Sequence, residues 1–268
     1  MTITTNTSRS NAFRALHQAG LLRLPNAWDA GSARLVESLG AKAIATTSAG
    51  LAWAAGYRDG NQLPTSLVLS ISEGIARVVS VPLSIDLEAG YSSDPAQVAD
   101  LVVRLAERGI VGINLEDGSG AAEVLARKIA AIKDALAKAG LDLFVNARTD
   151  VYLAGLVEAP GRVDEVLRRS SLYASAGADG LFVPAILSLP EIAEVARRAT
   201  LPLNVLSWKG LATPVELEAA GVRRLSAGSG ISARVWAEAA LKVRRFLDDG
   251  ELVGDAMPYT DLQRLFGQ

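Results

Sequence analysis

Hydrophobic and polar positions define two kinds of segment that alternate along the chain. Short aliphatic or β-branched runs predict strands, and longer amphipathic runs rich in Ala, Leu and Arg predict helices. The predicted strands are 21–25, 42–47, 82–86, 111–116, 143–148, 180–185, 201–206 and 222–226. The predicted helices are 31–39, 66–79, 95–108, 121–139, 161–176, 188–199, 213–220 and 231–248, and a further helix over the stretch "TSRSNAFRALHQAG" precedes the first strand.

This alternation of strands and helices, without a break in composition, favours a (β/α)8 TIM barrel. The chain has 268 residues, of which 50% are hydrophobic, and such a length suffices for one large core. We therefore expect a single domain over residues 1–268, with an N-terminal helix and a C-terminal extension. A doubly wound open sheet is the alternative fold.

Polar side chains recur at alternate positions near the ends of four predicted strands. Every second residue of a strand faces the same side, so residues two apart share a face. The polar residues that share one face in this way are Ser84, Asp86, Glu88, Asn114, Glu116, Asn146, Arg148 and Asn204. If the apolar alternates pack under the helices, these side chains converge inside the barrel near the carboxyl ends of the strands, where barrel active sites lie.

The acidic members of this set suit a metal ion. Asp86 and Glu88 are two positions apart, so they repel each other and resist burial unless a cation neutralises them. Together with Glu116 they offer only oxygen ligands, which favours Mg²⁺ and also permits Mn²⁺. The alternative is that these acids lie in solvated loops and cap the helices that follow.

Other residues of the same region suit an anionic substrate. Arg148 can bind a carboxylate through two parallel hydrogen bonds. Ser48, with the backbone N–H groups of Ala49 and Gly50, can form a small anion-binding turn, and Asn204 adds an amide on the inward face. A metal, an arginine and such a turn together favour a small 2-oxo acid, whose enolate the metal would stabilise as it forms.

Composition excludes several other classes of protein. The formal net charge is −2 and basic residues are spread along the chain, so we expect no nucleic-acid partner and no membrane partner. No apolar run reaches the length of a membrane span, and the polar N-terminus lacks a signal-peptide core. The chain has no cysteine, which excludes disulfides and cysteine catalysis, and we expect a cytoplasmic location. The one histidine, His17, precedes every strand and is interpreted as structural.

Several motifs resemble the isocitrate lyase/phosphoenolpyruvate mutase superfamily. They are "LPNAWDAGSARLVESLGAKAIATTSAG", "GYRDGNQLP", "PLSIDLEAGYSSD", "GINLEDG", "FVNARTD" and "GADGLFVPA", in order over roughly residues 23–248. The resemblance implies a (β/α)8 barrel whose C-terminal helix is swapped between the subunits of a homodimer or homotetramer. It also implies Mg²⁺ and a 2-oxo acid at the carboxyl ends of the strands.

The resemblance further implies roles for individual residues. Asp86 matches the direct metal ligand, and Glu88 and Glu116 match ligands that act through water. Asp59 matches an active-site acid near the waters of the metal. Ser48, Ala49 and Gly50 match the carboxylate-binding turn, and Arg148 matches the anion-binding arginine. These roles make Asp59, Arg148 and Glu116 the candidate catalytic residues.

The chain departs from this family after Glu116. Lyases of the family carry a catalytic Cys in a loop at this point, whereas here the segment "EDGSGAAEVLARKIAAI" runs almost directly into a helix. The usual isocitrate lyase reaction therefore lacks its acid, and phosphonate chemistry lacks the gating loop that contacts the phosphoryl group. Glu88 also stands where Asp is usual, which adds one methylene to its reach.

We therefore predict a Mg²⁺-dependent carbon–carbon lyase that cleaves a small 2-oxo acid by decarboxylation or a retro-aldol reaction. Three alternatives stay open. The first is phosphonopyruvate hydrolase or phosphoenolpyruvate mutase chemistry at the same site. The second is a Schiff-base aldolase that uses Lys209 as nucleophile. The third is a barrel that binds a 2-oxo acid without catalysis.

Overall fold

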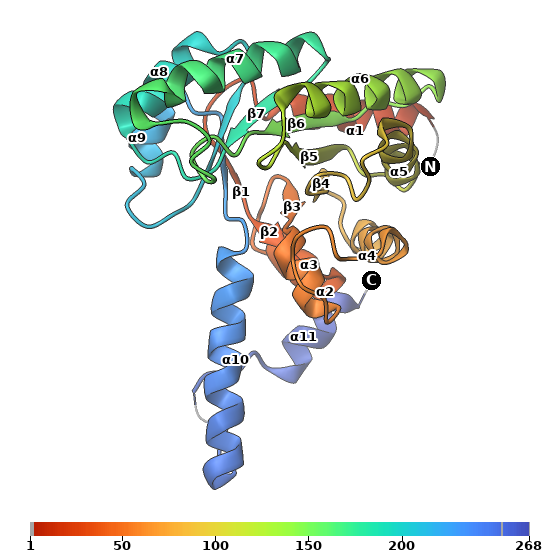
Figure 1. Ribbon diagram of the computed structural model, residues 1–268. Coiled ribbons are helices and arrows are strands. Elements are labelled where there is room, and N and C mark those ends of the chain that lie inside the picture. The colour runs from red at the N-terminus through yellow and green to blue at the C-terminus, as the bar shows by residue number, and fades with distance from the viewer. Residues whose placement is uncertain (1–2, 253, 268) are drawn as a thin grey trace.

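The strands of the computed structural model, which describes residues 3–252 and 254–267, form one parallel sheet that curves into a barrel (Figure 1). Their order around the sheet is that of the chain, apart from the first two strands. The strands are β1 (Leu22–Leu24), β2 (Asn26–Ala27), β3 (Ile44–Thr46), β4 (Leu83–Asp86), β5 (Gly112–Glu116), β6 (Phe144–Arg148), β7 (Gly180–Val183), β8 (Leu203–Leu206) and β9 (Arg224–Ser226).

The sheet closes through β1 and β2, which follow each other closely in the chain. β1 pairs with β9 and β2 pairs with β3, and only Pro25 separates β1 from β2 in the chain. Proline has no N–H group to donate to a ladder, so one strand is interrupted at this position. β1 and β2 therefore count as a single first strand, and the barrel has eight. The predicted (β/α)8 barrel is confirmed, and the doubly wound alternative is wrong.

Helices lie outside the barrel and most of them connect successive strands, whereas α1 precedes β1 and α10 and α11 follow β9 (Figure 1). They are α1 (Ile3–Ala15), α2 (Ala30–Ser38), α3 (Ser48–Ala54), α4 (Thr65–Val78), α5 (Pro95–Glu107), α6 (Ala122–Lys138), η1 (Ala159–Gly161), α7 (Arg162–Ser175), α8 (Leu189–Arg198), α9 (Pro214–Ala219), α10 (Gly230–Asp249) and α11 (Tyr259–Phe266). Several begin at residues that satisfy their first N–H groups. Asp29 forms a capping box with Ser32, and Asp94 accepts from the N–H of Ala96 at 2.9 Å.

The main core lies between the strands and the outer helices. Leu83, Ile85 and Leu87 are fully buried there, as are Ile113 and Val145 on the next two strands. These are the apolar alternates of the strands that carry the candidate site. Burying them on the outer face leaves the intervening polar residues on the inner face, as the alternation predicts.

The amino ends of the strands are closed by a small aromatic cluster under α1. Phe13 and His17 pack on Phe144, and the His17 and Phe144 rings are stacked with centroids 4.4 Å apart. The Nδ1 atom of His17 lies 2.9 Å from the carbonyl oxygen of Phe13. Burial, reinforced by the charges of Arg224 and Arg14, lowers the pKa of His17 to about 3. His17 thus lies at the amino ends of the strands, opposite the candidate site.

The C-terminal helix α10 projects away from the barrel instead of covering it, and α11 turns back toward α2 (Figure 1). Arg34 on α2 donates through Nε to the carbonyl oxygen of Leu265 on α11 at 2.9 Å. Large apolar side chains are exposed on α10, with Trp236 at 52% and Phe246 at 53%.

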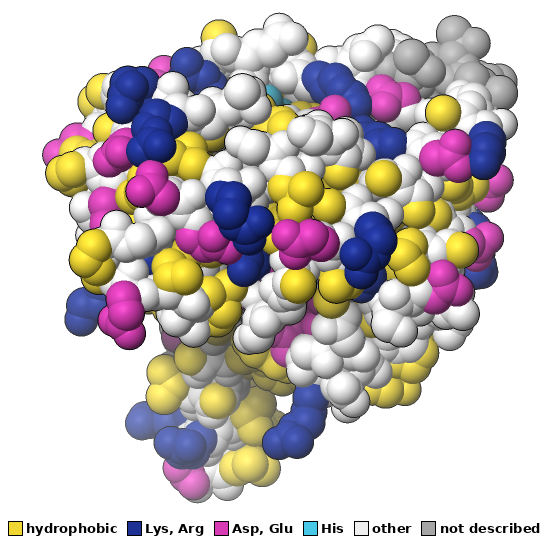
Figure 2. All heavy atoms as spheres, turned by 45° about the horizontal axis from the view of Figure 1, so that its top comes forward, with side chains coloured by type: hydrophobic (Ala, Val, Ile, Leu, Met, Phe, Trp, Pro, Cys, Tyr) yellow, Lys and Arg dark blue, Asp and Glu magenta, His cyan; other side chains and the backbone are white. Residues whose placement is uncertain are grey.

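Figure 2 shows charges of both signs mixed over the barrel face that it presents. Within the described part of the chain, no helix combines the length and the apolar character needed to cross a bilayer.

Candidate active site

The carboxyl ends of β4, β5 and β6 bring the predicted acids and arginine together. Asp86 is the last residue of β4, and it lies in register with Asn114 on β5. Glu116 and Arg148 end β5 and β6 and lie in register with each other. Strand pairing therefore places three carboxylates and one guanidinium at one rim of the barrel, since Glu88 follows Asp86 by two residues.

Arg148 is held between two carboxylates. Its Nη1 lies 2.6 Å from Oε2 of Glu116, and its Nε and Nη2 contact the two carboxylate oxygens of Asp150 at 2.7 and 2.9 Å. The guanidinium carbon also lies 6.0 Å from the centre of the Phe182 ring. Three of its five N–H donors are used, which leaves one on each Nη atom for a ligand. Arg148 and Asp150, two residues apart in the chain, thus form a local ion pair.

Glu116 resists ionisation although it contacts Arg148. Burial raises the pKa of Glu116 to about 8, and the negative charges of Asp86, Asp150 and Glu88 add to that effect. The positive charge of Arg148 lowers the pKa of Glu116, but Arg148 also forms an ion pair with Asp150. The cost of burying the carboxylate, together with the neighbouring acids, therefore outweighs the attraction of Arg148.

Glu88 occupies a constrained position in the loop after β4. Its φ is +50°, in the left-handed region that favours glycine, and its side chain is 4% exposed. Oε2 accepts a hydrogen bond from the N–H of Asn61, whereas Oε1 is enclosed without a well-formed hydrogen bond to any described residue. Burial, together with the charges of Asp59 and Asp86, raises the pKa of Glu88. Asp59 itself is exposed in the loop between α3 and α4.

The predicted anion-binding turn has a different local structure. Ser48, Ala49 and Gly50 are the first residues of the short helix α3, not a turn, and all three are buried. The N–H of Ser48 donates to Oδ2 of Asp86 at 3.2 Å. A Cβ atom on Gly50 would approach the Thr47 side chain to 2.7 Å, so only glycine fits at this point. These N–H groups still lie at the end of β3, on the rim that carries the acids.

A ring of buried polar side chains lies below this rim, inside the barrel. Arg224 on β9 donates through Nη2 to Oδ1 of Asn114 at 3.1 Å and through Nε to Oγ of Ser226 at 3.2 Å. Ser226 donates to Oδ1 of Asn204 at 3.2 Å. Asn146 closes the ring by donating to Oδ1 of both Asn114 and Asn204 at 2.9 and 3.0 Å.

Two findings follow from this ring. Asn204, predicted to bind substrate, is 1% exposed, and its amide nitrogen faces the carbonyl oxygens of Val205 and Arg224. Its contact with a substrate stays a prediction. Arg224 was not recognised in the sequence as part of the site. Arg224 and Ser226 are two residues apart on the last strand, and this spacing could have indicated that both face the barrel interior.

Asp117 is a buried acceptor behind Arg148. Its Oδ1 accepts from the N–H of Asp150 at 2.9 Å, and its Oδ2 accepts from Arg169 at 2.7 Å and from the Tyr173 hydroxyl at 2.5 Å. From its place directly after β5, Asp117 could be a loop residue or a helix cap. The structure instead shows that Asp117 links α7 to the residue that holds Arg148. A short turn, closed by the N–H of Gly120 on the Asp117 carbonyl, then leads into α6, so the shortened loop is confirmed.

The acids fit a hydrated Mg²⁺ better than an ion enclosed by protein. In the described residues, no three acidic or histidine side chains are placed so that they could hold an ion by themselves. The site nevertheless holds two carboxyls, Glu88 and Glu116, whose pKa values are raised by burial and by neighbouring acids, although the Tyr91 hydroxyl interacts with Glu88. Mg²⁺ keeps several waters when it binds through few carboxylates. Asp86 would bind the ion, and Glu88 and Glu116 would bind its waters.

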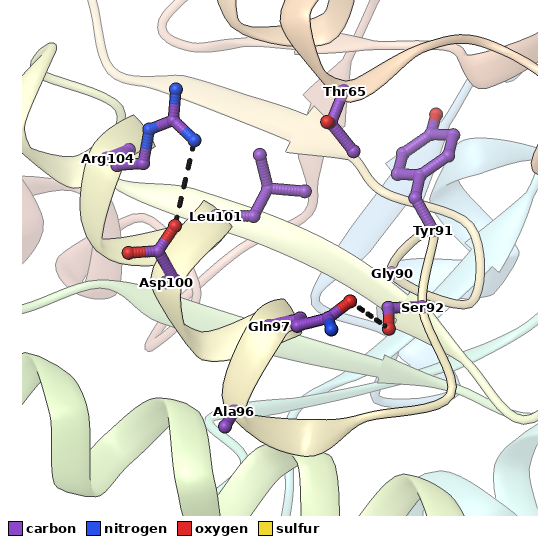
Figure 3. A pocket seen from close by; sticks show the side chains of 9 residues that line it. All are labelled: Thr65, Gly90, Tyr91, Ser92, Ala96, Gln97, Asp100, Leu101 and Arg104. Atoms are coloured by element: carbon purple, nitrogen blue, oxygen red, sulfur yellow. Dashed lines mark hydrogen bonds and ion pairs between the residues drawn. The ribbon is translucent and has the colours of Figure 1, made fainter.

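A groove of about 460 Å³ lies beside this site, between the start of α4, the loop after β4 and α5. Figure 3 shows Tyr91 and Thr65 at one end and the ion pair of Arg104 with Asp100 at the other. None of the candidate metal-binding acids lines this groove. The groove is therefore separate from the candidate site at the rim of the barrel.

Comparisons with known proteins agree with the fold and the arrangement of the site. Residues 13–247 match the model of the phosphoenolpyruvate phosphomutase family. An uncharacterised protein of Mycobacterium tuberculosis is 36% identical over 94% of this chain and 95% of its own length. A Burkholderia cenocepacia structure, provisionally described as a lyase/mutase, is 33% identical with a TM-score of 0.89, and the match covers 99% of this chain and 98% of that one. The 2-methylisocitrate lyase of Escherichia coli K12 is 30% identical over 78% of this chain and 73% of its own length.

These matches define a class of (β/α)8 barrel proteins that includes lyases and phosphomutases. The chain belongs to the phosphoenolpyruvate phosphomutase family, within the isocitrate lyase/phosphoenolpyruvate mutase superfamily. The family resemblance predicted from the motifs is thereby confirmed.

Proposed function

We propose that the chain is a Mg²⁺-dependent lyase that cleaves a carbon–carbon bond of a small 2-oxo acid. The observation that carries this proposal is the gathering of Asp86, Glu88 and Glu116 opposite Arg148 at the carboxyl ends of β4 to β6. The same rim carries the N–H groups at the start of α3. Such a set suits a ligand with a carboxylate and an adjacent carbonyl.

In the proposed reaction the bond between C3 and C4 of the substrate breaks, and its electron pair passes to C3 and the 2-oxo group. The second fragment leaves as CO2 from an oxaloacetate-like acid. From a 4-hydroxy-2-oxo acid it leaves as an aldehyde after the hydroxyl loses its proton. C3 then takes up a proton, which leaves pyruvate or a homologue. Mg²⁺, when bound, would supply Lewis-acid polarisation of the 2-oxo group.

The protein residues would bind and orient the substrate. The two free N–H groups of Arg148 would bind a carboxylate, and the ion pairs to Asp150 and Glu116 fix the guanidinium while they do so. The backbone N–H groups of Ala49 and Gly50 would bind a second anionic oxygen. Asp59 is the candidate residue for proton transfer, because its exposed loop position lets it reach the rim near Glu88.

Pyruvate release from oxaloacetate and from 4-hydroxy-2-oxo acids tests this proposal. We expect release with Mg²⁺ and none after EDTA treatment, with recovery on adding excess Mg²⁺. Release that is indifferent to EDTA would refute the metal-dependent reaction. Borohydride trapping of an adduct, lost in Lys209→Ala, would instead support a Schiff-base aldolase.

The family model itself favours a second candidate, phosphorus–carbon chemistry of the phosphonopyruvate hydrolase or phosphoenolpyruvate mutase type. The five-residue segment 117–121 between β5 and α6 argues against it, because so short a turn leaves no gating loop over a phosphoryl group. Phosphate release from phosphonopyruvate, or its conversion to phosphoenolpyruvate, would overturn our preference. Stabilisation by 2-oxo acids without any turnover would support a binding barrel.

We also infer a homodimer or homotetramer in which α10 is swapped onto a partner subunit. Its support is the exposed apolar surface of α10, which includes Trp236, Leu241 and Phe246. Light scattering should give a multiple of the 28.0 kDa chain mass, and Phe246→Glu should shift the population toward monomer. A monomeric wild-type chain would contradict this inference. We further propose a cytoplasmic enzyme whose ligand is the 2-oxo acid and not a nucleic acid or a membrane.

A further inference from the structure

Arg224 imposes a direction on the hydrogen bonds of the interior ring. The strand order places β9 and β5 four strands apart, so the contact of Arg224 with Asn114 crosses the barrel interior. Arginine has no acceptor, so every group it contacts must present an oxygen. Burial lowers the pKa of Arg224 to about 9 while the charge of Asp86 acts against that, so the guanidinium keeps its proton at neutral pH.

The orientation of the Asn114 amide follows from this direction. Its Oδ1 accepts from Arg224 and from Asn146, so this oxygen faces the interior and the β6 side. The Nδ2 group is then left on the side of Asp86, the residue in register on β4. No hydrogen bond within the described residues uses this Nδ2, and the atom is not fully enclosed. A ligand can therefore reach the Nδ2 atom of Asn114, whereas its Oδ1 is occupied by Arg224 and Asn146.

We propose that Arg224 is a positioning residue that locks the Asn114 amide so that its Nδ2 donates a hydrogen bond to an oxygen of the bound 2-oxo acid. This inference rests on the proposed function, because it places the ligand at the same rim. Without Arg224 the amide could rotate and present its oxygen to a site that already holds three acids. The Asn114 amide would then repel the anionic ligand to which it otherwise donates a hydrogen bond.

Titration calorimetry with oxalate and excess Mg²⁺ tests the inference without turnover. Oxalate is a planar di-anion with two adjacent carboxylates, so it can occupy a 2-oxo acid site. Asn114→Ala removes the donor, and Arg224→Lys keeps the positive charge but loses the fork that contacts both Asn114 and Ser226. Because a hydrogen bond to a charged group changes affinity by about tenfold or more, we expect each variant to bind oxalate about tenfold more weakly. The double variant should bind no more weakly than Asn114→Ala alone.

A matched control separates positioning from general damage to the ring. Ser226→Ala removes one ring contact of Arg224 but leaves the contact with Asn114, so it should bind oxalate as the wild type does. Independent effects of the two substitutions, multiplying to about a hundredfold in the double variant, would overturn the positioning role. If Arg224→Lys does not fold, Asn114→Ala decides alone, because wild-type affinity in that variant would overturn the proposal. A wild-type protein that binds no oxalate with Mg²⁺ would overturn both this inference and the proposed function.

Discussion

His17 provides a prediction about the stability of the barrel that is independent of the catalytic proposal. The imidazole is buried against Phe144 under α1, and burial lowers its pKa from 6.5 to about 3. It is therefore neutral in the folded protein, whereas the unfolded chain binds a proton below about pH 6.5. Its contribution to stability is fully present above that pH and is lost as the pH falls toward 3.

The size of the effect follows from the two pKa values. A difference between 6.5 and about 3 corresponds to about 5 kcal/mol across that range, or about 1.4 kcal/mol for each pH unit. Other groups also titrate there, so the comparison needs a variant that differs only at this ring. His17→Phe keeps an aromatic ring against Phe144 and cannot take up a proton.

Urea unfolding at a series of pH values between 7 and 4, at constant protein concentration, measures the effect. We expect the free energy of unfolding to fall more steeply with acidification in the wild type than in His17→Phe, by about 1 kcal/mol per pH unit. Turnover at pH 7 should be unchanged, because His17 lies at the amino ends of the strands. Parallel pH profiles for the two proteins would refute the assignment of a neutral buried imidazole.

Three further changes test the rim of the barrel. Arg148→Lys should lower kcat/KM about 10- to 100-fold, mainly through KM, because an ammonium cannot hold a ligand carboxylate bidentately; steady-state kinetics would show this. Asp117→Asn should cost about 2 to 3 kcal/mol in urea unfolding, since it leaves the buried Arg169 and Tyr173 donors poorly matched. Gly50→Ala should weaken oxalate binding in calorimetry by about tenfold or more, because the added methyl displaces the start of α3; wild-type affinity would contradict that placement.

The strands and the carboxylates of the rim were predictable from the sequence because strand periodicity is a local property. Alternation within "PLSIDLE" and "GINLE" is enough to place Asp86 and Glu116 on an inward face. Register between parallel strands then brings them together, whatever the details of the loops. The shortened turn after Glu116 was predictable for the same reason, because it lies within one continuous stretch of the sequence.

The remaining features depend on contacts between distant segments. Arg224 meets Asn114 only because the barrel closes, so no pattern within "VRRLS" shows its partner. Asp117 looks like a helix cap until α7 brings Arg169 and Tyr173 to it. Small residues at 48–50 predict a turn, whereas they are the buried first residues of α3, with Gly50 close to Thr47 and Trp28.

The metal dependence of pyruvate release tests the central claim most directly. The measurement is the initial rate with oxaloacetate, titrated with Mg²⁺ after EDTA treatment, for the wild type and for Asp86→Asn. We predict a saturable Mg²⁺ dependence in the wild type and, in Asp86→Asn, a rate at least about a hundredfold lower that excess Mg²⁺ does not fully restore. Equal rates in the two proteins, or a wild-type rate that ignores Mg²⁺, would contradict the assignment of Asp86 and the lyase proposal built on it.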